Sequence, residues 1–79
     1  MEKMNFDGDI YSTIRRNIRK YRIEQNMTAA QLAEHVELSH DFIRQIESEK
    51  VANTFSVETL YRISVVLGVT LDQLVEKQK

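Results

Sequence analysis

Four polar side chains close together in the sequence could recognise another molecule. Position 39 is a serine, a good N-cap residue, which predicts a helix beginning at position 40. This helix would present His40 and Asp41 in its first turn, and Arg44 and Gln45 would follow one turn later. Glutamine can pair with adenine, arginine with guanine or a phosphate, aspartate with the amino group of cytosine, and histidine can donate or accept. The four residues are therefore candidates for reading base edges, and the alternative is an ordinary solvated helix face. Phe42 between them could touch a thymine methyl group or fold back onto the core.

The apolar spacing of residues 28–47 indicates which elements position these side chains. Leu32 and Val36 are one helical turn apart. Ile43 and Ile46 have nearly the same spacing. An alanine directly after Leu32 leaves room for another helix to cross almost in contact. Two short helices joined by a tight turn are the pattern of a helix-turn-helix, whose second helix enters a DNA groove.

The chain as a whole is predicted to be all-α, with several helices and no sheet. It has no proline and two glycines in 79 residues, and its β-branched residues do not alternate with polar ones. We expect one compact five-helix domain over residues 9–77, preceded by a flexible tail over residues 1–8. The helices are expected to cover residues 9–25, the stretch after Thr28, Ser39 to about Ser48, 57–67 and 71–77.

Capping residues and apolar stripes indicate the ends and inward faces of these helices. Thr28 and Thr70 are each followed three residues later by glutamine, which forms a capping box. Asn26 and Gly68 suit the left-handed conformation that ends many helices. The expected inward residues are Ile10, Ile14, Ile18 and Tyr21 in the first helix and Val57, Leu60, Ile63 and Leu67 in the fourth.

The last two helices carry more apolar surface than one small core uses. Tyr61 and Val65 point away from the inward face of their helix. Leu71 and Val75 add a second apolar patch. An extra apolar face near a terminal helix favours a twofold dimer with these four residues at its interface. The alternative is that the leucines of the last helix fold back onto the domain, which we expect for Leu74.

The charge of the chain is compatible with DNA binding but does not require it. Eleven basic and twelve acidic residues give a net charge of −1 and a pI near 6.1, whereas phosphate contacts need cations. The first helix is locally positive, because the basic residues between positions 10 and 23 are accompanied by no acidic one. Four of these residues are Arg15, Arg16, Arg19 and Lys20, and we expect one or two of the four to reach DNA phosphates and the others to form a solvated face. The fifth is Arg22.

Several classes of function lack support in the sequence. The chain contains no cysteine, and its two histidines, His35 and His40, have no clustered carboxylate or thiol with which to bind a metal. It shows no nucleophile–base pairing, glycine-rich phosphate loop or paired-carboxylate motif. No apolar run approaches the ~20 residues that span a bilayer, and no signal peptide is visible. We therefore expect a cytoplasmic protein that is not an enzyme and uses no metal or cofactor.

Many residues occur at spacings shared by one known protein family. The matching residues are Arg22, Met27, Thr28, Leu32, Ala33, Ser39, Ile43 to Glu47, Leu67, Gly68, Val69 and Leu74. In this register, residues 14–75 resemble the Cro/C1-type helix-turn-helix family, the Xre-like repressors of phages and bacteria. The resemblance implies a lambda-repressor-like fold and a transcriptional repressor that binds double-stranded DNA as a homodimer on an inverted repeat, although activation by touching polymerase is equally compatible. In related repressors, the positions of His40, Asp41 and Gln45 reach base edges.

The resemblance also implies roles for residues outside that surface. Arg22 and Glu47 would form an ion pair between the first helix and the end of the third. Ala29, Glu37 and Glu49 depart from the family's pattern, which often has glutamine, glycine and glycine at these positions. Glu37 would then need a positive φ angle, at a cost of roughly 1 kcal/mol. The expected phosphate contacts are Thr28, Ser39, Phe42, Lys50, Asn53 and Thr54.

A different class of function is also compatible with the sequence. The same scaffold could act as a protein-interaction module, such as an antitoxin or an anti-repressor, that binds a regulatory protein partner. The acidic pI and the residues Ala29, Asp41 and Glu49 favour this interpretation. The exposed apolar residues of the last two helices would then hold the partner protein.

Overall fold

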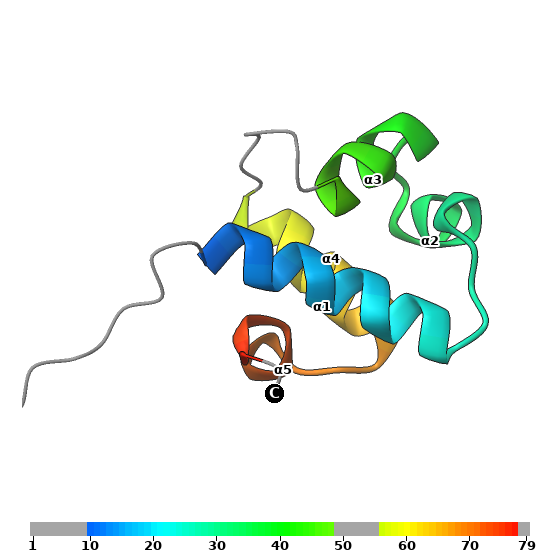
Figure 1. Ribbon diagram of the computed structural model, residues 1–79. Coiled ribbons are helices and arrows are strands. Elements are labelled where there is room, and N and C mark those ends of the chain that lie inside the picture. The colour runs from blue at the N-terminus through cyan, green and yellow to red at the C-terminus, as the bar shows by residue number, and fades with distance from the viewer. Residues whose placement is uncertain (1–9, 49–55, 78–79) are drawn as a thin grey trace, which may run out of the picture.

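The computed structural model describes residues 10–48 and 56–77, which form five helices and no strand (Figure 1). The all-α prediction is therefore confirmed, with helix ends within two residues of those expected. The expected tail over residues 1–8 lies outside the described residues. The helices are α1 (Ile10–Glu24), α2 (Ala29–Val36), α3 (His40–Glu47), α4 (Val57–Leu67) and α5 (Leu71–Val75).

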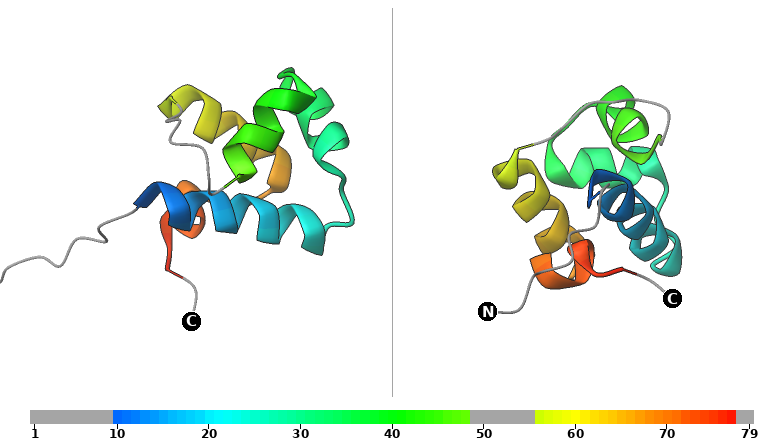
Figure 2. Two further views of the ribbon diagram at one scale, coloured as in Figure 1. Left: turned by 45° about the horizontal axis from the view of Figure 1, so that its top comes forward. Right: turned by 60° about the vertical axis from the view of Figure 1, so that its left-hand side comes forward.

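Helix α1 runs through the middle of the arrangement. Figure 1 shows α2 and α3 on one side of α1 and α5 on the other, and Figure 2 shows the same grouping from two further directions. Helix α1 contacts α3, α4 and α5, whereas α2 packs on α3 and α4. None of the helices in the described ranges is long and apolar enough to cross a membrane.

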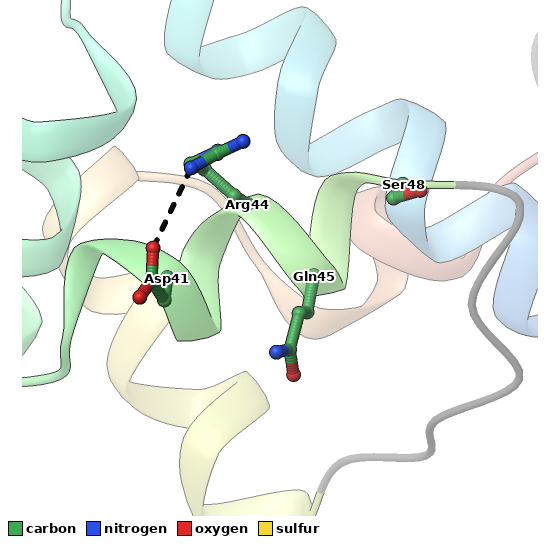
Figure 3. Close-up of a pocket in the computed structure, with 4 residues that line it drawn as sticks. All are labelled: Asp41, Arg44, Gln45 and Ser48. Atoms are coloured by element: carbon green, nitrogen blue, oxygen red, sulfur yellow. Dashed lines mark hydrogen bonds and ion pairs between the residues drawn. The ribbon is translucent and has the colours of Figure 1, made fainter.

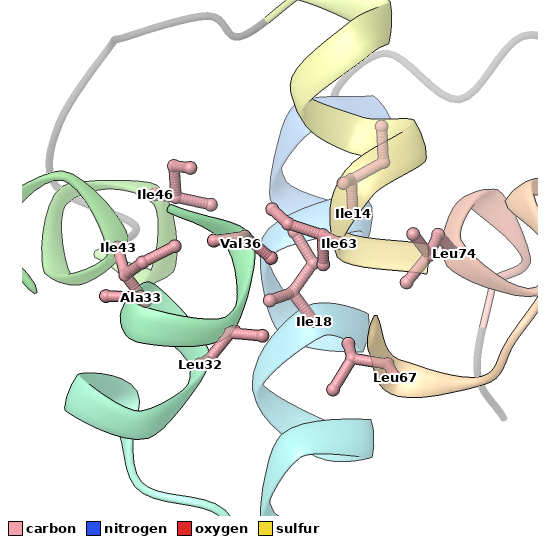
Figure 4. Close-up of a cluster of buried hydrophobic side chains, with 10 residues drawn as sticks. All are labelled: Ile14, Ile18, Leu32, Ala33, Val36, Ile43, Ile46, Ile63, Leu67 and Leu74. Carbon is pink, nitrogen blue, oxygen red and sulfur yellow. The ribbon is translucent and has the colours of Figure 1, made fainter. Parts of the chain in front are cut away.

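The core is a single cluster of aliphatic side chains to which every helix contributes (Figure 4). Six of them, including Ile18, Leu32 and Ile63, have no exposed surface or nearly none. Leu74 folds back onto this cluster, as expected. The buried members are Ile14, Ile18, Leu32, Ala33, Val36, Ile43, Ile46, Ile63, Leu67 and Leu74.

The predicted caps account for where the helices begin and end. The Thr28 and Thr70 hydroxyls each accept a hydrogen bond from a backbone N–H three residues on, and both capping boxes are complete. Asn26, Glu37 and Gly68 have left-handed backbones, with φ angles of 57°, 61° and 68°. Glu37 therefore occupies the conformation that the glycine of related sequences would adopt more easily.

Two apolar residues expected to face inward lie at the surface instead. Val57 is 75% exposed and Ile10 is 37% exposed, and each is the first residue of its helix. At about 100° per residue, Val57 lies roughly 120° around α4 from the fully buried Ile63. It therefore continues the outward stripe of Tyr61 and Val65, which follow it at intervals of four residues.

Three polar residues of α1 are buried, Thr13, Arg15 and Asn17, and the burial of none of them was expected. Arg15 is 4% exposed, so its assignment to a solvated or phosphate-binding face is wrong. Asn17 is fully buried, and its Nδ2 atom donates to the backbone oxygens of Leu74 and Glu76, both at 2.7 Å. Asn17 thus joins the C-terminal end of α5 to α1. Its position three residues after Ile14 and next to Ile18 is the sequence signal that could have indicated its burial.

The left-handed turn after α2 leads to a stability prediction. Glu37→Gly should stabilise the domain by about 1 kcal/mol, because glycine adopts a positive φ angle without the strain imposed by a Cβ atom. Removing a carboxylate from the negative end of α2 acts in the same direction. Urea unfolding followed by circular dichroism measures the change.

Gly68→Ala is the matched control for this prediction. A Cβ added at Gly68 would meet no heavy atom within 4 Å, so this substitution changes only the backbone strain. It should destabilise the domain by about 1 kcal/mol. A loss of stability in Glu37→Gly would show instead that the Glu37 side chain stabilises the turn by more than its strain costs.

Candidate nucleic-acid interface

Helices α2 and α3 and the turn between them form a closely packed unit. The backbone N–H of Leu38 donates to the Ala33 oxygen at 2.9 Å, which satisfies a carbonyl left open at the end of α2. The Leu38 side chain packs against the core, and the Ser39 hydroxyl then accepts from the Phe42 N–H at 3.1 Å. The chain thus reverses and starts a new helix within three residues.

Helix α3 separates its apolar and polar side chains sharply. Ile43 is fully buried and Ile46 is 3% exposed, so the helix is anchored along one side. The four candidate base-reading residues, His40, Asp41, Arg44 and Gln45, are all exposed on the other sides. The structure therefore brings these residues together on the exposed side of one short helix.

The exposed surface of α3 contains a shallow hollow of about 290 Å³ lined by Asp41, Arg44, Gln45 and Ser48 (Figure 3). The Arg44 Nη1 atom lies 3.5 Å from the Asp41 carboxylate, with both side chains mostly exposed. Such an exposed pair contributes little to stability. It leaves both charged groups available to other partners and holds the arginine beside an acceptor.

The expected phosphate contacts divide into two groups. Thr28 and Ser39 are exposed at the starts of α2 and α3, where their hydroxyls already cap the helices. Phe42 is half-buried and packs against the core, which is the second of its two expected placements. The remaining expected contacts, Lys50, Asn53 and Thr54, lie outside the described residues.

Arg22 joins α1 to the end of α3 through a two-pronged ion pair. Its Nε atom donates to Glu47 Oε2 at 2.7 Å, and its Nη2 atom donates to Glu47 Oε1 at 2.9 Å. The third nitrogen, Nη1, donates to the Met27 backbone oxygen at 2.7 Å. The two side chains are only 13% and 9% exposed, so this pair is partly buried and shaped by the fold.

The described residues include no cluster of three or more histidine, aspartate or glutamate side chains suited to a metal ion.

The basic side chains of α1 differ strongly in their surroundings. Arg16, Arg19 and Lys20 are exposed, whereas Arg15 is buried and donates from Nη1 to the Ser48 oxygen at 3.0 Å. Two arginines of α1 therefore contact the end of α3.

Comparison with known proteins identifies the family. A sequence model of the helix-turn-helix family matches residues 18–74, most of the chain. The chain belongs to the Cro/C1-type helix-turn-helix family. Members of this family are DNA-binding transcription regulators and not enzymes, so the chain is a DNA-binding transcription regulator. A comparison with curated proteins gave no match.

Three solved structures illustrate the likeness within this family. The DNA complex of SinR, a master regulator for biofilm formation, is 28% identical over 80% of this chain and 98% of that chain, with a TM-score of 0.72. The hypothetical transcription factor NHTF from Neisseria is 17% identical over 98% and 84%, with a TM-score of 0.82. The clp gene regulator ClgR from C. glutamicum is 19% identical over 94% and 87%, with a TM-score of 0.75. The last two show a shared fold.

The ion pair between α1 and α3 gives a second stability prediction. Arg22→Met should lower the free energy of unfolding by about 3–5 kcal/mol, because it leaves the Glu47 carboxylate partly buried without its cation. It also removes the hydrogen bond to the Met27 oxygen. Chemical unfolding measures the loss.

A double variant separates the missing cation from general damage to the fold. Arg22→Met combined with Glu47→Leu removes both charges, so the double variant should be more stable than Arg22→Met alone. If the double variant is equally or less stable, the loss in Arg22→Met comes from packing or from the Met27 contact, and not from an uncompensated carboxylate.

Proposed function

We propose that this regulator is a repressor that binds an inverted-repeat operator as a twofold dimer. Each subunit places α3 in a major groove, with the two half-sites about 34 Å apart. The observation that carries the proposal is the division of α3 into a fully anchored apolar side and an exposed polar side. A helix held in this way can present its polar groups to base edges at fixed positions.

The proposed base contacts come from four exposed residues of α3. Gln45 suits adenine and Arg44 suits guanine, since both side chains can form paired hydrogen bonds in the major groove. Asp41 accepts from the cytosine amino group, and His40 donates or accepts. Asp41 and Arg44 lie within 3.5 Å of each other, so together they suit a G·C base pair or two neighbouring ones.

Two of the proposed phosphate contacts lie at the starts of α2 and α3. Thr28 and Ser39 are exposed there, and the first backbone N–H groups of a helix favour anionic oxygens. The further proposed phosphate contacts are Phe42, Lys50, Asn53 and Thr54. Support for double-stranded DNA as the partner comes from the family and from the DNA complex of SinR. A cytoplasmic location is part of the proposal, because it fits double-stranded DNA as the partner.

The proposed dimer interface rests on an outward apolar stripe. Val57, Tyr61 and Val65 are 75%, 57% and 60% exposed and follow one another at four-residue intervals along α4. The stripe is symmetric about Tyr61, so antiparallel packing of two α4 helices sets Val57 of each copy opposite Val65 of the other. A twofold interface requires this kind of self-complementary surface. Leu71 and Val75, which are 36% and 39% exposed, extend the proposed interface onto α5.

Selection of genomic DNA fragments at two salt concentrations tests the proposed function. We expect recovery of an inverted repeat, with an affinity that falls steeply as salt rises. On that operator, the double variant Arg44→Ala/Gln45→Ala should lose about 100-fold in affinity or more, because each paired base contact contributes about 1–3 kcal/mol. Its preference for the operator over random DNA should disappear.

Arg19→Ala/Ile23→Ala is the control, since it removes one arginine and one other exposed side chain from α1. It should keep the preference for the operator. Unchanged operator affinity in the α3 variant would contradict the proposed base contacts. Recovery of no fragment above background would favour the protein-interaction module over the repressor.

The dimer has its own test in solution. Val65→Arg should convert the protein to a monomer in sedimentation equilibrium, because the proposed packing would bury the added charge opposite Val57 of the other copy, without a partner. Ile23→Arg is the matched control, since Ile23 is 48% exposed and lies outside the proposed interface. A dimer that persists in Val65→Arg would show that another surface joins the subunits.

A further inference from the structure

We propose that Arg15 is a positioning residue for DNA recognition, which holds the C-terminal end of α3 without itself touching DNA. The inference rests on the proposed function only in taking α3 as the helix that reads DNA. Its basis is the burial of Arg15, which is 4% exposed, and the hydrogen bond from its Nη1 atom to the Ser48 oxygen at 3.0 Å. Arg15 thus contacts the backbone directly after the last residue of α3.

The position of Arg15 relative to Arg22 explains why two contacts are needed. The two residues are seven positions apart, so they lie on nearly the same side of α1 and about 10.5 Å apart along its axis. Their targets, Glu47 and Ser48, are adjacent in the sequence. The two guanidinium groups therefore reach the same end of α3 from different points along α1. One contact alone would leave α3 able to pivot, and the second restricts that motion.

The contact between Arg15 and Ser48 restricts the pivoting of α3 further, because it holds the main chain. Arg22 holds a side chain, which can change rotamer, whereas Arg15 holds a main-chain oxygen. Ser48 is the C-cap of α3, and its own N–H bonds to the Gln45 oxygen. A cation at this end also complements the negative end of the helix. Since α3 has only eight residues, it is marginal as an isolated helix and depends on such contacts for its orientation.

A direct contact between Arg15 and a DNA phosphate does not fit this geometry. The guanidinium would have to leave its buried site and its hydrogen bond to Ser48. Arg16 and Arg19 are exposed on the same helix and need no such change. The effect of Arg15 on DNA binding must therefore pass through the position of α3.

Operator affinity measured over a series of salt concentrations tests the proposal on the full chain. Arg15→Met, which keeps much of the side-chain volume, should weaken binding roughly tenfold at a temperature at which circular dichroism shows it folded. The slope of affinity against salt should stay unchanged, because no phosphate contact is lost. Arg15→Lys should restore part of the affinity, since lysine can still donate to the Ser48 oxygen. Arg19→Met is the control, with the same residue type on the same helix but an exposed side chain.

Three results would overturn the proposal. If folded Arg15→Met binds the operator as tightly as the original protein does, Arg15 contributes to stability only. A salt slope reduced by about one would mean that Arg15 contacts a phosphate. An affinity in Arg15→Lys no better than in Arg15→Met would show that the donor to Ser48 does not matter. If Arg15→Met does not fold, Arg15→Lys carries the test, with an expected loss of about threefold and an unchanged slope.

A measurement without DNA keeps this inference separate from the proposed function. Amide hydrogen exchange in Arg15→Met should speed up in α3 and at Ser48 and stay unchanged in α5, which is held by Asn17. Uniformly faster exchange in both helices would contradict a local positioning role. Failure of the original protein to bind any operator would count against the repressor, while the exchange result would still decide the role of Arg15.

Discussion

The two-pronged ion pair between Arg22 and Glu47 is the contact on which the orientation of α3 and of its exposed polar side depends. Helix α3 has eight residues, too few to be stable alone in water, and α2 is equally short. Two apolar anchors, Ile43 and Ile46, set which side of α3 faces the core. Aliphatic contacts are not directional, so they leave the helix able to slide and pivot. Hydrogen bonds from Arg15 and Arg22 of α1 to Ser48 and Glu47, at the end of α3, fix the orientation of α3.

Helix α1 serves as a common support for elements that are distant in sequence. Arg15 and Arg22 hold the end of α3, and Asn17 holds the end of α5 through main-chain oxygens. These contacts lie on a single rigid helix, so the positions of α3 and α5 are linked. Recognition of two half-sites at a fixed separation requires this kind of link if α5 takes part in the dimer. In the proposed dimer, the polar contacts buried along α1 would thus connect the position of α3 on the DNA with the position of the partner subunit.

The features that predicted the fold involve residues close together in the sequence. The features that the sequence did not predict depend on contacts between distant residues. Capping boxes at Thr28 and Thr70 need only the next three residues, so sequence spacing suffices to find them. Arg15 looks the same in sequence as its exposed neighbours, and its burial depends on Ser48, 33 residues away. Val57 precedes Leu60 by three residues, which suggested an inward position, but it lies roughly 120° around α4 from the buried Ile63 and is exposed. The contacts of the candidate base-reading residues depend on DNA, so only their shared exposed surface can be compared with the prediction.

The near-neutral charge of the chain lowers its non-specific affinity for DNA, which affects how such a regulator would select its operator. Non-specific affinity for DNA comes almost wholly from cations at phosphates, and this chain has a net charge of −1. The carboxylate of Asp41 on the exposed surface of α3 further weakens contact with an arbitrary backbone. In the proposed complex, that same carboxylate, which lies 3.5 Å from Arg44 in the protein alone, would accept from a cytosine amino group in the major groove. Low background affinity increases the ratio of specific to non-specific binding, which determines occupancy of an operator among many competing sites. An acidic residue on α3 is therefore compatible with DNA binding, and with the proposed base contacts it would shift the source of affinity from phosphates toward base edges.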